Sequence, residues 1–197
     1  MINEAMEYAR GIFEADASGH DFDHTLRVYK MAIRIAEEER ADVQQVALAA
    51  LLHDVDDRKI SPETYENKDR AVYFLQKHGV TEEETLKIVQ IISEISFSAG
   101  NGVPSTVEGM CVQDADRLDA MGAIGIGRAF AFGGTRGRRM HDPEGKDTTS
   151  TIQHFYDKLL LLKDRMNTET GKKLASQRDA YLRGFLEEFY AEWDGLR

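Results

Sequence analysis

Hydrophobic residues recur at helical spacing along most of this chain. Residues 3–16 and 22–40 each carry apolar side chains three and four positions apart, and the segment that follows Asp42 is apolar almost throughout. Asp42 is suited to cap that segment as a nearly buried helix. Valine and isoleucine fall at the same spacing and do not alternate with polar residues. The pattern therefore predicts an all-α fold.

Short capping motifs predict where the later helices begin. Ser61-Pro62 indicates a helix that ends near residues 77–79, because serine caps a helix and proline fits its first turn. Capping boxes of the form Ser/Thr-x-x-Glu/Gln predict three further starts. These boxes begin at Thr81, Ser105 and Ser150.

The last third of the chain is expected to hold a long loop and two helical regions. Residues 133–149 are rich in glycine and charged side chains, which is typical of a mobile loop. A final amphipathic helix is predicted from about Thr168 to Trp193. The length of 197 residues suits one domain over 1–197. In that domain, helices over 150–195 would pack on a core of about residues 20–120.

The charge and the cysteine content exclude several classes of protein. The net charge of −10 opposes binding to nucleic acid or to an anionic membrane. Cys111 is the only cysteine, so no internal disulfide can form and a reducing compartment is expected. Residues 1–10 lack the pattern of a secretory signal, and no apolar run approaches the roughly 20 residues of a membrane span. We expect a cytoplasmic protein.

Three short amphipathic stretches contain the residues with the most evident chemistry. They read HDFDH, LLHDVDD and QDADRLDA, and they supply two imidazoles and two carboxylates. The candidate ligands are His24, His53, Asp54 and Asp116, with Asp114 and Asp119 as competitors for the last place. Two nitrogen and two oxygen ligands suit a divalent ion such as Mn²⁺, Mg²⁺, Fe²⁺, Ni²⁺ or Zn²⁺. Each stretch alone is a weak signal, since isolated histidines are more often capping or core residues.

Taken together, HDFDHTLRV, AALLHDVDD and QDADRLDA resemble the HD-domain metal-dependent phosphohydrolase superfamily. The later stretches GAIGIGRAF and HFYDKLLLLKDRMNTETGKKLA resemble a bacterial subgroup of small stand-alone HD hydrolases. The resemblance implies a helical bundle of the HD type that holds one divalent ion. It selects Asp116, in its Ala-Asp-Arg setting, over the two neighbouring aspartates. The implied metal ligands are His24, His53, Asp54 and Asp116.

Asp57 is the candidate catalytic residue. A helix continuing past His53 and Asp54 would place Asp57 on their face, and the related guanosine-tetraphosphate hydrolases resemble this arrangement. Asp57 would then be a general base, the alternative being a solvated carboxylate. Asp56, turned away from that face, is expected to face solvent.

A phosphate substrate also requires cationic or donor side chains. Arg27 lies one turn after His24, on the same helical face, and can bind a phosphate through two hydrogen bonds. Arg58 and Lys59 follow the acidic cluster directly, and His20 is a further candidate for substrate contact or for capping. Surface ion pairs are the competing interpretation of the cationic residues.

A second basic group lies late in the chain. It contains Arg128, Arg136, Arg138 and Arg139, three of which belong to the expected loop. The loop could close over a polyphosphate or simply be solvated. His154 and Lys158, four residues apart on a helix, could reach the site, although a surface role is the simpler interpretation.

The predicted function is hydrolysis of a phosphorus–oxygen bond in a soluble nucleotide. The leading expectation is a nucleoside triphosphate pyrophosphohydrolase, and the close alternative is a nucleoside monophosphate phosphatase of the 5′-nucleotidase type. A non-catalytic HD-like scaffold that binds a nucleotide or a partner is the alternative from another class. The expected partner is a small phosphate-bearing molecule, with a homodimer through an apolar helix face as a further possibility.

Overall fold

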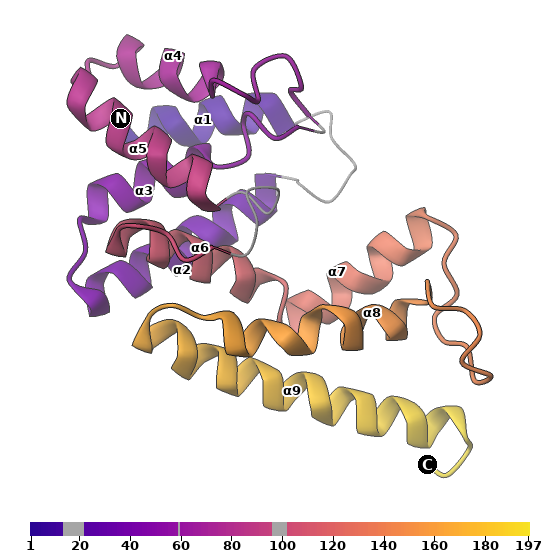
Figure 1. Cartoon of the computed structure of the whole chain (residues 1–197). Helices are drawn as coiled ribbons and strands as arrows, with labels where there is room; N and C mark the ends of the chain where they lie inside the picture. Colours follow the sequence, from indigo (N-terminus) through magenta and orange to yellow (C-terminus); the bar gives the residue numbers. More distant parts are fainter. Residues whose placement is uncertain (14–21, 59, 96–101) are drawn as a thin grey trace. The chain divides into compact units, whose positions relative to one another are not determined.

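The computed structural model describes residues 1–13, 22–58, 60–95 and 102–197, and every regular element in those ranges is a helix (Figure 1). The predicted all-α fold is therefore confirmed. The helices are α1 (Ile2–Phe13), α2 (Phe22–Glu39), α3 (Val43–Leu52), α4 (Asp69–Lys77), α5 (Glu82–Ile95), α6 (Val107–Asp119), α7 (Gly122–Thr135), α8 (Thr151–Asp157), the 3₁₀ helix η2 (Leu159–Arg165) and α9 (Glu169–Trp193).

The chain forms two compact units, Met1–Asp116 and Arg117–Arg197, whose boundary falls inside α6. Each unit is described separately below. The packing of helices over 150–195 on a core of residues 20–120 stays a prediction. None of the helices in the described ranges combines the length and the apolarity that crossing a bilayer requires.

Helix α3 is the centre of the N-terminal unit. It contacts α1, α2 and α5, and every residue from Val46 to Leu52 is buried. Its start is the predicted one, because Asp42 Oδ1 accepts hydrogen bonds from the backbone N–H groups of Gln44 and Gln45 at 2.9 and 3.1 Å. The almost wholly apolar sequence of this helix is thus explained by packing on several sides.

The predicted start of α4 at Ser61-Pro62 is wrong. The Ser61 hydroxyl donates instead to the carbonyl oxygen of Val55 at 3.0 Å, and turns lead from there to the helix at Asp69. Serine hydroxyls commonly form such local bonds to the backbone, which compete with a capping role. The predicted end is right, since α4 stops at Lys77 and His78 follows as its cap.

Asp56 supplies the missing cap of α4. Its carboxylate accepts the backbone N–H of Arg70 at 3.1 Å and that of Ala71 at 3.0 Å, both in the first turn of the helix. Asp56 is 0% exposed, so the expectation that it faces solvent is wrong. That expectation assumed a continuing helix, whereas α3 ends at Leu52 and turns follow.

The capping boxes of α5 and α6 had different outcomes. The box at Thr81 is confirmed, because its hydroxyl accepts the Glu84 N–H and the Glu84 carboxylate accepts the Thr81 N–H, both at 3.3 Å. At α6 the cap is Thr106, one residue later than predicted. Ser105 is instead held by Glu94 of α5, whose carboxylate accepts the Ser105 N–H at 2.7 Å. A side chain from another helix has therefore displaced the local motif.

In the C-terminal unit, α9 contacts α7 and η2. Ser150 caps α8 as predicted, but Gln153 bonds to Asp157, so the capping box is only half formed. Thr168 caps α9, which ends at Trp193, close to the predicted span. The first three residues of the loop predicted over 133–149 belong instead to α7, which ends at Thr135. In the rest of that segment, the Asp142 carboxylate accepts three backbone N–H groups.

The Asp56 cap generates a prediction about stability. Replacing Asp56 with alanine leaves two N–H groups at the start of α4 without their acceptor, one of them buried. We expect the free energy of unfolding to fall by about 1–3 kcal/mol. Urea unfolding followed by circular dichroism measures the change. Glu66→Ala, an exposed carboxylate in the same connection, is the matched control, and equal stability of the two variants would contradict the capping role.

Candidate metal centre

The N-terminal unit brings together side chains from three separate segments. His24 lies in the first turn of α2, His53 and Asp54 directly follow the end of α3, and Asp116 lies in α6. The buried helix α3 ends where its sequence changes from leucine to histidine and aspartate. Because α3 is held by several neighbours, the polar pair at its end has a fixed position.

The four polar groups form a compact cluster. His24 Nε2 lies 3.6 Å from Asp54 Oδ2 and 3.5 Å from Asp116 Oδ1. His53 Nε2 lies 3.2 Å from the same Asp54 oxygen. The two imidazole rings meet edge to face, with centroids 5.5 Å apart. Asp54 is therefore the centre of the cluster, and the structure places all four residues proposed as ligands next to one another.

The His53 ring is oriented for ligation. Its Nδ1 lies 2.8 Å from the Ala50 carbonyl oxygen, which can only accept, so Nδ1 carries a proton. The other nitrogen, Nε2, then faces the cluster with its lone pair when the ring is neutral. Within the described part of the chain, that atom is buried and has no partner that meets the criteria of a hydrogen bond, although Asp54 Oδ2 lies 3.2 Å away. Metal-binding histidines are commonly oriented by such a second hydrogen bond.

The electrostatics of the cluster favour positive charge. Burial lowers the pKa of His53, but the nearby carboxylates of Asp54 and Asp116 have the larger combined effect and raise that pKa to about 9. A proton therefore partly neutralises the two carboxylates. A divalent cation in the same place would neutralise them more fully and would compete with this proton.

The donor set fits a divalent ion. Ligand atoms of His24, His53 and Asp54 all lie within 4.8 Å of one another, and Asp116 contacts His24. Both histidine side chains are almost fully buried, whereas the Asp116 side chain is 35% exposed. The cluster is thus closed on the histidine side and accessible at Asp116, which is compatible with access for a substrate.

Two competitors for the fourth position have other surroundings. Asp119 forms an ion pair with Arg128 at 2.7 Å within the C-terminal unit. Asp114 is fully buried in α6.

Cys111, on the same helix, is also buried, and burial with nearby carboxylates raises its thiol pKa to about 12. A neutral thiol of this kind is a poor nucleophile.

The other candidate residues are only partly placed. A turn joins Asp54 to Asp57, whose N–H donates to the Asp54 carbonyl oxygen at 3.0 Å, so the continuing helix that we expected is wrong. Asp57 and Arg27 are half-buried and Arg58 is exposed. His20 and Lys59 fall in the parts of the chain that the structure leaves undescribed. Sequence reasoning missed the role of Asp56, for which the chain offers no local signal.

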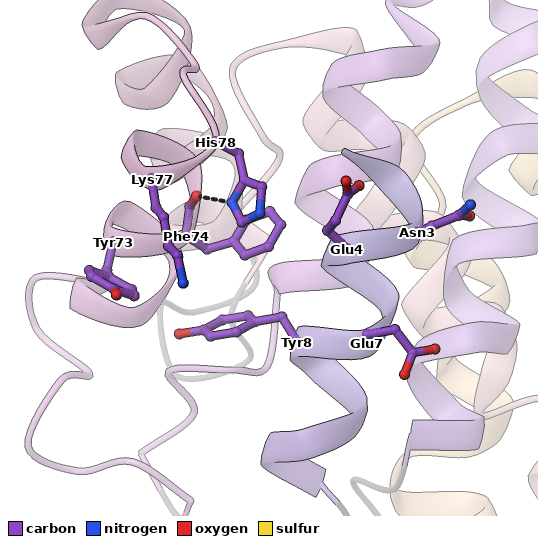
Figure 2. Close-up of a pocket in the computed structure, with 8 residues that line it drawn as sticks. All are labelled: Asn3, Glu4, Glu7, Tyr8, Tyr73, Phe74, Lys77 and His78. Carbon is purple, nitrogen blue, oxygen red and sulfur yellow. Dashed lines mark hydrogen bonds between the residues drawn. The ribbon is translucent and has the colours of Figure 1, made fainter.

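A separate pocket of about 470 Å³ lies between α1 and α4 (Figure 2). Aromatic rings form much of its wall, with Tyr8 and His78 both packed against Phe74 at centroid distances of 5.0 and 4.1 Å. The full lining is Asn3, Glu4, Glu7, Tyr8, Tyr73, Phe74, Lys77 and His78. None of these residues belongs to the cluster of His24, so the pocket and the candidate metal centre are different places.

Similar proteins give the geometry a context. YpgQ of Bacillus subtilis is 39% identical over 197 residues, which cover 96% of this chain and 92% of YpgQ. A crystal structure of YpgQ in complex with ADP superposes with a TM-score of 0.85 at 34% identity, covering 100% of both chains. An HD-superfamily hydrolase from Bacillus thuringiensis superposes with a TM-score of 0.84 at 42% identity, covering 98% of this chain and 96% of that one.

The sequence pattern of the HD domain family matches residues 21–121, the segment that contains the whole cluster. That match and the high coverage of the relatives agree with the resemblance seen in the three motif stretches. This chain belongs to the HD domain family.

Proposed function

We propose that this HD-domain protein is a divalent-metal-dependent phosphohydrolase that cleaves a soluble nucleoside triphosphate to a monophosphate and pyrophosphate. The observation that carries the proposal is the cluster of two imidazoles and two carboxylates around Asp54, in which the buried His53 Nε2 lacks a hydrogen-bond partner among the residues that the structure describes. A buried polar atom without a partner is costly, and a cation would remove that cost. The relative YpgQ has been crystallised with ADP, which supports a nucleotide as ligand.

In this proposal His24, His53, Asp54 and Asp116 hold the ion. A divalent ion bound there supplies positive charge for phosphate oxygens and makes water more acidic. The Ala50 carbonyl fixes the His53 ring, and the exposed side of Asp116 leaves room for substrate. Asp54, which lies within 3.6 Å of both imidazoles, would be the ligand that links the histidine pair.

We further propose that Asp57 accepts a proton from water during hydrolysis. The turn that joins it to Asp54 keeps its backbone close to a candidate ligand, and its side chain is only half-buried. Arg27, on α2 one turn after His24, would bind phosphate oxygens with its planar guanidinium. Arg58, Lys59 and His20 are proposed as further substrate contacts on the strength of their positions in the sequence.

Metal content tests the ligand set. We expect wild-type protein loaded with Mn²⁺ and then dialysed to retain metal, and His53→Ala and Asp54→Ala to bind it at least about 10-fold more weakly. Elemental analysis of the dialysed samples gives the result. His78→Ala is the matched control, because this histidine caps α4 and lies in the separate pocket. Equal metal in all four proteins would overturn the site.

A nucleotide panel tests the reaction. With Mn²⁺, Mg²⁺, Co²⁺ or Ni²⁺ present, we expect nucleoside triphosphates to yield pyrophosphate and not orthophosphate, because the proposed cut lies after the first phosphate. The two products are measured separately. Orthophosphate released from monophosphates alone would instead identify a 5′-nucleotidase. If metal-loaded protein hydrolyses none of the nucleotides, the proposed reaction is wrong and the non-catalytic HD-like scaffold is the remaining interpretation.

Asp57→Asn tests the proposed general base. Loss of a general base typically lowers kcat about 10²- to 10⁴-fold, so we expect a decrease of that order with metal content unchanged. The readouts are steady-state kinetics and elemental analysis of the same preparation. Glu66→Gln, a similar loss of charge at an exposed position, should leave kcat intact. Wild-type kcat in Asp57→Asn would contradict the assignment.

A further inference from the structure

Positive charge is concentrated in one segment of an otherwise acidic chain. Residues 120–141 contain four arginines and no aspartate or glutamate. They contribute +4 to a net charge of −10, so the rest of the chain carries −14. Opposite charges are normally interspersed on a protein surface, and a local excess of one sign is typical of a site for the other.

Two of the four arginines are already neutralised. Arg128 pairs with Asp119 at 2.7 Å, and Arg139 pairs with Asp142 at 3.2 Å. Arg136 and Arg138 are exposed, and within the described ranges neither has a carboxylate at ion-pair distance. Their guanidinium carbons lie 5.4 and 5.5 Å from the centroid of the same Phe132 ring.

The turn that carries these two arginines, residues 136–138, is fixed by hydrogen bonds; we call it the arginine turn. The N–H groups of Arg136 and Arg138 both donate to the Gly133 carbonyl oxygen, at 3.2 and 2.9 Å, and Gly137 adopts the left-handed conformation with φ of 65°. Downstream, the Thr151 N–H donates to the Arg139 carbonyl oxygen at 2.9 Å. The two guanidinium groups therefore start from a backbone that is held on both sides.

His154, in helix α8, is affected by the positive charges of this region. The pKa of His154 is lowered, first by burial and then by the charges of Lys158 and Arg138, against the weaker opposite effect of Asp157. Lys158 and Arg138 therefore act on the same imidazole. His154 of α8 therefore feels the positive charge of the arginine turn through Arg138.

A purely structural role accounts for part of this arrangement. The carbonyl end of α7 carries partial negative charge, which nearby arginines neutralise, and an arginine on an aromatic ring gains a modest cation–π energy. Neither effect uses the N–H donors of the guanidinium groups. Among the described residues those donors have no acceptor, whereas Arg128 and Arg139 each have one.

We propose that the arginine turn binds a chain of two or three phosphates. Guanidinium groups pair with phosphate oxygens through two hydrogen bonds, and two of them on one turn can address successive phosphates of a chain. Phe132 restricts both side chains, so less conformational entropy is lost when an anion binds. The choice of a phosphate chain rests on the proposed function, but the site requires neither the metal nor turnover.

Calorimetric titration with inorganic tripolyphosphate, in the presence of a chelator, tests the site without the metal centre. We expect wild-type protein to bind, and the double variant Arg136→Ala/Arg138→Ala to bind at least about 10-fold more weakly, because two charge-assisted contacts are lost. Lys30→Ala/Arg34→Ala, which removes two exposed cations from α2, is the matched control and should bind as wild type does. Unchanged affinity in the arginine double variant would overturn the proposal.

Further titrations separate this site from the metal centre and from a general attraction of anions. Asp54→Ala should retain tripolyphosphate binding, and its loss there would assign the anion to the metal centre and overturn the proposal. Orthophosphate should bind much more weakly, and equal affinity would refute recognition of a chain. Nucleoside triphosphate should compete with tripolyphosphate in wild type, and lack of competition would count against the site.

Arg136→Lys/Arg138→Lys keeps the charge but removes the paired hydrogen bonds, so it should show an intermediate loss of affinity. It also provides the test if the alanine variant fails to fold. If wild-type protein binds tripolyphosphate at the arginine turn but hydrolyses no nucleotide, the phosphate-chain site is supported and the proposed function is wrong.

Discussion

The cost of burying charge at the end of an apolar helix is the constraint on which the N-terminal unit depends. Helix α3 is buried along seven consecutive residues, and the chain then turns directly into His53 and Asp54. Neither side chain can reach bulk water freely, so each needs a partner of opposite or complementary character. His24 of α2 lies 3.6 Å from Asp54, and Asp116 of α6 lies 3.5 Å from His24, so these two helices complete the polar cluster. The helices that build the core therefore also determine which polar groups meet.

The periodicity of apolar residues predicted most of the helices and the buried character of α3. Local caps were also predicted correctly at three positions, since Asp42, Thr81 and Ser150 each accept a hydrogen bond from the first turn of the helix that they precede. Errors occurred where a distant side chain outcompeted the local motif. Ser105 is held by Glu94 from the preceding helix, and α4 is capped by Asp56 from fourteen residues upstream of Arg70. Such partners are set by tertiary packing, which a single sequence does not display.

The same distinction applies to the candidate site. The types and the order of His24, His53, Asp54 and Asp116 indicated one cluster, because a metal centre needs that combination of donors. The placement of Asp57 on the same face as His53 and Asp54 assumed that the helix continues to Asp57. That assumption is wrong, because α3 ends at Leu52. The types of residue therefore predicted the cluster better than helical periodicity extended beyond the end of α3 predicted the position of Asp57. The end itself depends on the turns that follow, where side chains such as Ser61 bond to the backbone.

Within the short stretch HDVDD, two aspartates separated by a single residue have unrelated surroundings. Asp54 lies among the imidazoles, and Asp56 holds the first turn of α4. In an alanine scan of this stretch, substitutions at both positions would lower activity, one by removing a candidate metal ligand and the other by destabilising the fold. Loss of activity is therefore not a sufficient criterion for a ligand here. A family-wide preference for acidic residues at both positions would likewise reflect two selective pressures acting side by side.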